Sequence, residues 1–256
     1  MKLSKTSAIV LGTLLASGAT MAQTAAPAPA AAPEPEYTLA YNIGVVSDYR
    51  FRAIAQTSTN PALQGGIDFT HKSGFYLGTW ASNVSWIKDY IGATDGSLEL
   101  DLYGGYKGEI SKDFSFDVGL IGYLYPSNTA PTNANTTEIY GALTYGPATV
   151  KYSRSLGNFI ANPNSSGSSY LELAATFDLG NGLSLTPHVG HQWIPNVVNN
   201  AGDYTDVALT LAKDFGNGLT LSIAAMGTNA DKIFYTDNKN KFLADSVLTV
   251  GLKYSF

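Results

Sequence analysis

The sequence is notable first for what it has little of. It contains no cysteine, which excludes disulfides and thiolate metal sites. Charged residues make up only 14% of the chain, against about 25% in a typical soluble domain. After the N-terminus there is no apolar stretch of about 18 residues, so any embedding in a membrane has to use strands rather than helices. The net charge of -5 argues against nucleic acid as a partner.

The first 36 residues predict an exported chain. Lys2 and Lys5 precede a short apolar stretch at 8–17, and small residues follow it. This is the arrangement of a secretory signal peptide, which we predict over residues 1–22. Residues 23–36 are rich in proline and alanine, and we predict an extended periplasmic spacer there, because proline fixes φ and removes backbone donors.

From Tyr37 onward, apolar and polar residues alternate in about twelve segments. The first of them continues the alternation as far as Arg52, which is long for a strand of a soluble protein. Segment 75–84 alternates as well, but its aromatic residues leave open which face points outward. Alternation over this many segments predicts an all-β chain whose strands have one apolar and one polar face.

The connections between these segments alternate strictly between short and long. Short turns fall near 71–74, 110–113, 146–147, 179–182 and 215–218, and longer polar segments at 53–60, 85–97, 126–136, 157–167, 194–203 and 229–244. The repeats DLGNGLSL (178–185) and DFGNGLTL (214–221) place Asn-Gly in two of the short turns, where positive φ is expected. An up-and-down barrel explains this alternation, whereas a Greek-key sandwich does not. We therefore predict that residues 37–256 form a transmembrane up-and-down antiparallel β-barrel of about 12 strands. The sheet has to close on itself, because every backbone N–H and C=O group in hydrocarbon must be hydrogen-bonded.

Aromatic residues at the strand ends predict two interfacial girdles. The turn-side set is Tyr37, Tyr106, Phe114, Tyr145, Phe177, Tyr254 and Phe256, and the loop-side set is Tyr49, Phe51, Tyr152 and Trp193. The terminal strand 245–256 also resembles the insertion signal of bacterial outer-membrane barrels, with Gly251, Tyr254 and Phe256 as its signal residues. This resemblance implies two partners, the barrel-assembly machinery and outer-membrane lipid.

Thirteen charged residues fall on the predicted inner face and are the candidate pore-lining residues. They are Asp48, Arg50, Arg52, Asp68, Glu99, Asp101, Lys107, Asp117, Glu138, Lys151, Glu172, Asp206 and Lys253. Eight acids against five bases predict a weak cation preference if the lumen is a wet pore. The alternative is that these charges pair across strands and plug the barrel. Twelve strands lie between the small barrels that side chains fill and the large barrels that enclose an open channel, so the strand number does not decide between the two.

Arg50 and Arg52 are the strongest single candidates for binding an anionic or hydroxylated solute. Asp48 lies beside them, so internal neutralisation of these two charges is an equal alternative.

Enzyme and metal sites are not predicted. A lipid hydrolase on a barrel needs a serine activated by histidine, and His71 and Ser73 lie together only in a turn that lacks an orienting third residue. His188 and His191 are three positions apart on a strand and therefore point to opposite faces. We predict no catalytic residue, no cofactor and no metal.

Four stretches are familiar as a set: SDYRFRAIAQT (47–57), PALQGGIDFTHKSGFYLGTWASNV (61–84), LDLYGGYKGEI (100–110) and DVGLIGYLYPSN (117–128). With them the sequence resembles the TorF-type porin family of Gram-negative outer membranes, which usually has glycine where this chain has Ala53. The resemblance implies an outer-membrane channel for small hydrophilic solutes or ions, and supplies no solute. The alternative is a non-conducting barrel that acts as an adhesin or structural protein through its loops, with 229–244 as a contact site or constriction.

Overall fold

The computed structural model describes residues 35–256. The predicted signal peptide (1–22) and residues 23–34 of the predicted spacer lie outside the described residues. Within 35–256, no helix is both long enough and apolar enough to cross a membrane.

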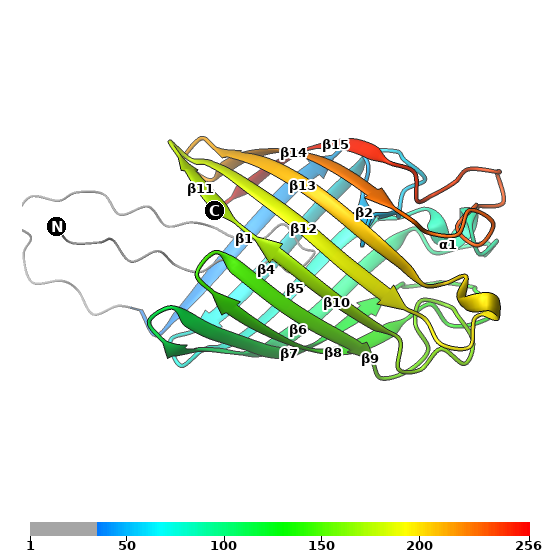
Figure 1. The fold of residues 1–256 in the computed structure, drawn as a ribbon, viewed down its shortest axis with the longest axis horizontal. Helices are drawn as coiled ribbons and strands as arrows, with labels where there is room; N and C mark the ends of the chain where they lie inside the picture. Colours follow the sequence, from blue (N-terminus) through cyan, green and yellow to red (C-terminus); the bar gives the residue numbers. More distant parts are fainter. Residues whose placement is uncertain (1–34) are drawn as a thin grey trace, which may run out of the picture.

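The described residues form a closed, 12-stranded antiparallel barrel (Figure 1). Its strands are β1 (Tyr37–Val46), β4 (Ala62–His71), β5 (Phe75–Asn83), β6 (Leu98–Ser111), β7 (Phe114–Leu124), β8 (Thr136–Tyr145), β9 (Ala148–Ser155), β10 (Ser169–Ala175) with β11 (Phe177–Gly180), β12 (Leu183–Trp193), β13 (Tyr204–Asp214), β14 (Leu219–Thr228) and β15 (Val247–Ser255). β10 and β11 both pair with β12 and are separated by Thr176 alone, so they count as one interrupted strand. Successive strands are neighbours, and β1 pairs with β15, which confirms the predicted up-and-down topology.

Long loops gather at one end of the barrel and short turns at the other, as predicted (Figure 1). The start of β1 and the end of β15 both lie at the short-turn end. In the two repeated turns, Asn181, Gly182, Asn217 and Gly218 all have positive φ, a conformation that asparagine and glycine accept with the least strain.

The outward face of the wall is apolar. On β1, for example, Leu39, Tyr41, Ile43 and Val45 are between 36% and 51% exposed. β5 follows the same rule, which resolves its facing: Phe75 and Leu77 are exposed, and Trp80 is buried inside. A continuous apolar outer surface on a closed sheet is the property that embedding in hydrocarbon requires.

The turn-side aromatic residues lie outward as predicted and contact one another. Phe256 stacks on Tyr41 at 5.7 Å between ring centroids and on Tyr254 at 5.8 Å. Phe75 and Tyr106 meet edge to face at 5.0 Å. These contacts place the two aromatic residues of the predicted insertion signal, Tyr254 and Phe256, in the outer band at the short-turn end.

The first predicted strand is wrong in its second half. β1 ends at Val46, and the chain then leaves the wall and folds into the lumen, where β2 (Arg50–Phe51) pairs with β3 (Ile54–Ala55). Tyr49 and Phe51, predicted in the loop-side girdle, are instead only 7% exposed. The physical reason is that both faces of a hairpin inside the barrel contact other side chains. Apolar and polar residues therefore still alternate along it, although neither face points to lipid.

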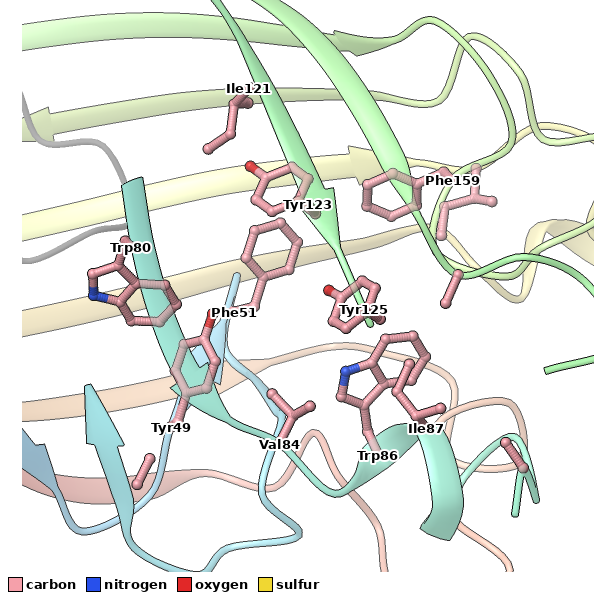
Figure 2. Packing of buried hydrophobic residues seen from close by; sticks show 14 residues of the cluster. Tyr49, Phe51, Trp80, Val84, Trp86, Ile87, Ile121, Tyr123, Tyr125 and Phe159 are labelled. Atoms are coloured by element: carbon pink, nitrogen blue, oxygen red, sulfur yellow. The ribbon is translucent and has the colours of Figure 1, made fainter. Parts of the chain in front are cut away.

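A cluster of buried aromatic residues fills the loop-side end of the barrel around this segment (Figure 2). Tyr49 packs edge to face on Trp80 at 5.4 Å, and Phe51 on Tyr123 at 5.2 Å. Helix α1 (Trp86–Asp89) adds Trp86, and the short 3-10 helix η1 (Val198–Asn200) lies in the loop between β12 and β13. The hydrophobic core of the molecule is thus at the loop end of the lumen.

Candidate functional site

The candidate site is the lumen, and its central element is a hairpin formed by residues 49–56, called the hairpin below. Arg50 pairs with Ala55 and Phe51 with Ile54, which leaves Arg52 and Ala53 as a two-residue turn. Their φ values are 48° and 63°, and two positive values at these positions define a type I′ turn. A side chain in this conformation costs about 1–2 kcal/mol, so contacts of the tip have to offset that cost at Arg52 and Ala53.

Arg52, at the tip of the hairpin, contacts the opposite wall of the barrel. Its Nη2 lies 2.7 Å from Glu138 Oε2 on β8, and its Nη1 donates to Gln192 Oε1 on β12 at 2.6 Å. The guanidinium also lies over the ring of Tyr170, 4.3 Å from the centroid. Because the hairpin leaves the wall after β1 and reaches β8 and β12, it crosses the lumen.

The ion pair of Arg52 and Glu138 is almost fully buried, with side-chain exposures of 3% and 1%. Burial lowers the pKa of the Arg52 guanidinium, but Glu138, Tyr123 and Tyr170 together raise it further, so its pKa lies above the usual value. Because water hardly reaches this pair, each charge is compensated mainly by its partner. Loss of one partner would leave an uncompensated buried charge.

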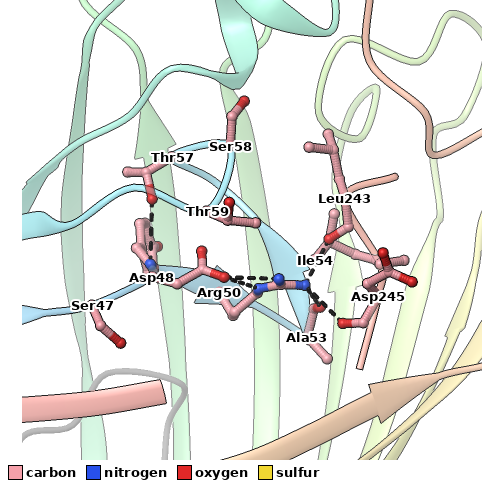
Figure 3. Close-up of polar contacts among 12 residues, drawn as sticks. Ser47, Asp48, Arg50, Ala53, Ile54, Thr57, Ser58, Thr59, Leu243 and Asp245 are labelled. Carbon is pink, nitrogen blue, oxygen red and sulfur yellow. Dashed lines mark hydrogen bonds and ion pairs between the residues drawn. The ribbon is translucent and has the colours of Figure 1, made fainter. Parts of the chain in front are cut away.

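Arg50 fixes the base of the hairpin (Figure 3). Its Nη2 and Nε both lie 2.7 Å from Asp48 Oδ2, and its Nη1 donates to the carbonyl oxygens of Leu243 at 2.7 Å and Ala53 at 3.1 Å. The backbone N–H of Ala55 also donates to the Leu243 carbonyl at 2.9 Å. Burial raises the pKa of the Asp48 carboxyl, and the Arg50 guanidinium partly opposes that rise. Arg50 and Arg52 are therefore both neutralised by carboxylates, and neither presents an open anion-binding group in this structure.

Three buried acidic residues near the hairpin have carboxylate oxygens that accept no hydrogen bond from the described residues. Tyr49 donates its hydroxyl to Glu99 Oε1 at 3.1 Å. Among residues 35–256, one oxygen of each of Glu99, Asp101 and Glu138 is buried and has no hydrogen-bond partner. These three side chains are at most 2% exposed. Within residues 35–256, no group of three or more histidine or acidic residues has the arrangement of a metal site.

A second polar network lies around His188 on β12. Its Nε2 is 3.2 Å from Glu172 Oε2 and its Nδ1 is 3.4 Å from Asp206 Oδ1. The Tyr170 hydroxyl donates to Asp206 Oδ2 at 2.9 Å, and the ring of the same tyrosine makes the cation–π contact with the Arg52 guanidinium. His191 instead packs on Trp193, with ring centroids 4.3 Å apart, so the two histidines do point to opposite faces.

Tyrosine hydroxyls pair with two of the remaining carboxylates nearer the short-turn end. Tyr76 donates to Asp117 at 2.6 Å and also contacts the hydroxyl of Tyr140, while Tyr103 donates to Asp68 at 2.5 Å. The Nζ of Lys151 lies 4.5 Å from the Tyr140 ring centroid. This part of the lumen is polar and mixed in charge.

The structure places the thirteen candidate residues inside the barrel in two groups. Nine are buried: Asp48, Arg50, Arg52, Glu99, Asp101, Asp117, Glu138, Glu172 and Asp206. Asp68, Lys107, Lys151 and Lys253 are more accessible. Asp48, Arg50 and Arg52 reach the lumen on the hairpin rather than on a wall strand, which corrects their predicted placement. That these residues line a conducting pore stays a prediction.

Uncharged residues complete the site, and the search for charges missed them. Gln192 holds the hairpin tip, Tyr170 joins Arg52 to Asp206, and Tyr123 donates to Glu138 at 3.3 Å. All three occupy inward positions of the alternating pattern, so strand periodicity was the signal that would have found them.

Solved structures with a similar fold are outer-membrane barrels. The chain is similar to the KdgM porin in complex with disordered oligogalacturonate (9% identity, TM-score 0.54, covering 85% of this chain and 98% of that one) and to the NanC porin (9%, 0.54, 85% and 99%). It is also similar to an outer-membrane channel from Pseudomonas putida F1 (13%, 0.50, 91% and 99%). At these identities the likeness defines a fold class, the porin-like barrel.

Residues 30–256 match the model of a family described as "Bacterial protein of unknown function (Gcw_chp)", and the chain belongs to this family. No curated protein matches the chain. The family description does not name the TorF-type porins, so that more specific resemblance stays a prediction.

Proposed function

We propose that the protein is an outer-membrane channel for small hydrophilic solutes or ions in a Gram-negative bacterium. The observation that carries this proposal is a closed barrel with an apolar outer face around a charged interior. Residues 1–22 would export the chain, 23–36 would form a periplasmic spacer, and 37–256 would be inserted by the barrel-assembly machinery through the signal at Gly251, Tyr254 and Phe256. The fold shared with porins supports the proposal.

The charges of the lumen support a weak cation preference. Of the eight acids and five bases, Asp48 pairs with Arg50 and Glu138 pairs with Arg52. Removing both pairs from each count leaves six acids, Asp68, Glu99, Asp101, Asp117, Glu172 and Asp206, and three lysines, Lys107, Lys151 and Lys253. Carboxylates favour cations where they line a narrow aqueous path. Five of these six are buried, and Asp68 is the accessible one, so the proposed preference requires that the conducting path run along the buried carboxylates.

The hairpin sets how much of this path is open. It crosses the lumen, and the side chains that hold its tip are almost fully buried. We therefore expect the wild-type channel to conduct in small or infrequent steps, with the hairpin as the constriction.

Single-channel recording tests this proposal. The refolded mature protein is inserted into a planar bilayer with a salt gradient across it, and folding is confirmed by heat-modifiable gel mobility. We expect discrete steps and a reversal potential on the cation-selective side. An anion-selective potential would contradict the charge argument, and a silent membrane with a folded barrel would contradict the channel.

The second candidate is a non-conducting barrel that acts as an adhesin or structural protein through its loops. The packed hairpin and aromatic cluster favour it, because they occupy the loop end of the lumen. In loop 229–244, Tyr235 folds inward and donates to the Gly202 carbonyl at 2.6 Å, whereas Ile233 is 91% exposed. A glycan or host ligand bound through this exposed part of the loop, together with a silent bilayer, would support this function.

A further inference from the structure

One sector of the outer wall differs from the rest at the loop end. Over most of the wall, the outward residues nearest the loops are apolar, such as Val45 on β1, Leu63 on β4 and Leu248 on β15. The neighbouring strands β9, β10, β12 and β13 (Figure 1) instead carry polar and aromatic side chains at these positions. These residues, called the polar sector below, are Tyr152, Arg154, Ser169, His191, Trp193 and Thr205.

Strand pairing places the members of the polar sector side by side. Ser169 on β10 is directly opposite Arg154 on β9 and Trp193 on β12. Tyr152 and His191 are the next outward residues of β9 and β12, one outward position deeper in the membrane. Because neighbouring strands lie about 4.8 Å apart, the backbone positions of Arg154 and Trp193 are separated by about 10 Å. Only the small side chain of Ser169 lies between them.

Arg154 supplies the charge of the polar sector. Its side chain is exposed and is hydrogen-bonded to Tyr152. A β-carbon at Gly167, in the loop before β10, would lie 2.7 Å from Arg154 Nη2, so this glycine makes room for the guanidinium. Among residues 35–256, Arg154 forms no ion pair. The outward positions of the described wall strands also carry no acidic side chain, so the wall does not compensate this charge.

Trp193 supplies an aromatic surface next to this charge. Its side chain is 40% exposed, and its ring packs on that of His191 with the centroids 4.3 Å apart. His191 Nδ1 in turn lies 2.7 Å from Thr205 Oγ1, which fixes the imidazole. Tryptophan is typical of membrane interfaces, where its ring lies among the lipid headgroups. The face of a tryptophan ring also packs well on the C–H groups of a sugar ring.

The position of the polar sector indicates which lipid it contacts. Long loops lie on the extracellular side of an outer-membrane barrel. A lipid-facing arginine is costly at the bilayer centre and much less costly near an interface, so Arg154 fits the level of the extracellular headgroups. In a Gram-negative outer membrane this leaflet consists of lipopolysaccharide, whose lipid A part carries phosphate groups on a glucosamine disaccharide. The guanidinium fork matches phosphate oxygens, with two N–H donors for two acceptors.

We propose that the polar sector binds the lipid A part of one lipopolysaccharide molecule, with a phosphate group on Arg154 and a sugar ring on Trp193. Charge complementarity favours an anionic group at Arg154, and the neighbouring indole favours a phosphate attached to a sugar over one attached to glycerol. The site faces lipid rather than the lumen and takes no part in conduction. It rests on the outer-membrane placement given under the proposed function, and not on the channel.

Native mass spectrometry of the full mature chain, refolded in detergent micelles, tests the binding. Lipid A is the probe. Phosphatidylglycerol has a phosphate without a sugar ring, and phosphatidylcholine has neither a net charge nor a sugar. We expect one lipid A molecule per barrel at saturation, with an affinity at least tenfold above that for phosphatidylglycerol, and no saturable binding of phosphatidylcholine.

Four substitutions locate the bound lipid. Arg154→Gln should weaken lipid A binding at least tenfold, because hydrogen bonds to a charged group are lost. Arg154→Lys keeps the charge without the fork and should retain part of the affinity. Trp193→Leu keeps an apolar side chain without the ring and should bring the affinity for lipid A close to that for phosphatidylglycerol. Lys232→Gln removes a positive charge from an exposed loop position and should leave binding unaltered.

Three results would overturn the site: no saturable binding of lipid A, equal binding by Arg154→Gln and the wild type, or an equal loss in Arg154→Gln and Lys232→Gln. Equal affinities of the wild type for lipid A and phosphatidylglycerol would overturn the choice of lipid. These results are distinct from failure of the channel. A silent bilayer with saturable lipid A binding contradicts the proposed conduction and leaves the site intact, and conduction without lipid A binding does the reverse.

Discussion

Arg52→Met and Glu138→Gln are each expected to destabilise the barrel by about 3–5 kcal/mol, because each leaves one charge of a buried pair without its partner. The double variant is expected to lose no more than either single one, since no unpaired charge then remains. Urea-induced unfolding in lipid vesicles measures the free energy of unfolding for the four proteins of this double-mutant cycle.

Lys72 and Glu36 provide the matched control for this cycle. Their ion pair is as short, at 2.6 Å, but the two side chains are 60% and 71% exposed. A cycle on Lys72 and Glu36 should give a coupling below about 1 kcal/mol. If the Arg52–Glu138 cycle gives a coupling equally small, the hairpin tip is not anchored in the way that the structure shows.

Arg52→Ala is expected to increase channel activity several-fold, in the frequency or the size of the conducting steps. The change removes the contacts to Glu138, Gln192 and the Tyr170 ring. The hairpin then keeps its base, which Arg50 holds, and the packing of Tyr49 and Phe51, but its tip is no longer anchored to the opposite wall. Planar-bilayer recordings at one protein concentration and voltage measure the difference.

Arg154→Ala is the control for the recordings. Arg154 is on β9 and is exposed, so the same substitution removes an arginine without touching the hairpin. Its traces should match those of the wild type. An unchanged trace for Arg52→Ala, or an equal increase for both variants, would show that the tip contacts do not control conduction.

The wall of the barrel could be predicted from the sequence because two local signals agree. Period-2 alternation locates each strand, and the alternation of short turns with long loops sets the topology. The Asn-Gly pairs at 181–182 and 217–218 mark tight turns by their own backbone preference. None of these signals requires knowledge of contacts between distant residues.

The hairpin could not be predicted in this way. Residues 47–52 alternate like the wall strand that precedes them, and alternation does not distinguish a lipid-facing side chain from one buried inside the lumen. The outward assignment of Tyr49 and Phe51 failed for this reason. The turn of the hairpin gave no local signal either. Arg52 and Ala53 both have positive φ, but neither residue type is typical of that conformation.

Partner choice inside the lumen also lies beyond the sequence. Arg52 and Glu138 are 86 positions apart and meet only because the barrel closes and the hairpin crosses it. Asp48 and Arg50 are two positions apart, and here the sequence did supply the correct alternative, internal neutralisation. Proximity in the chain allowed that pairing to be proposed, and the long-range pair needed the fold.

Replacement of residues 47–61 by Asn-Gly tests most directly whether the hairpin closes the lumen. Val46 and Ala62 are paired across β1 and β4, so a two-residue turn joins them without a change in the wall. With folding confirmed by heat-modifiable mobility, we expect single-channel steps several-fold larger than those of the wild type. Steps of unchanged size from the folded variant would contradict the account, because the lumen would then be limited elsewhere.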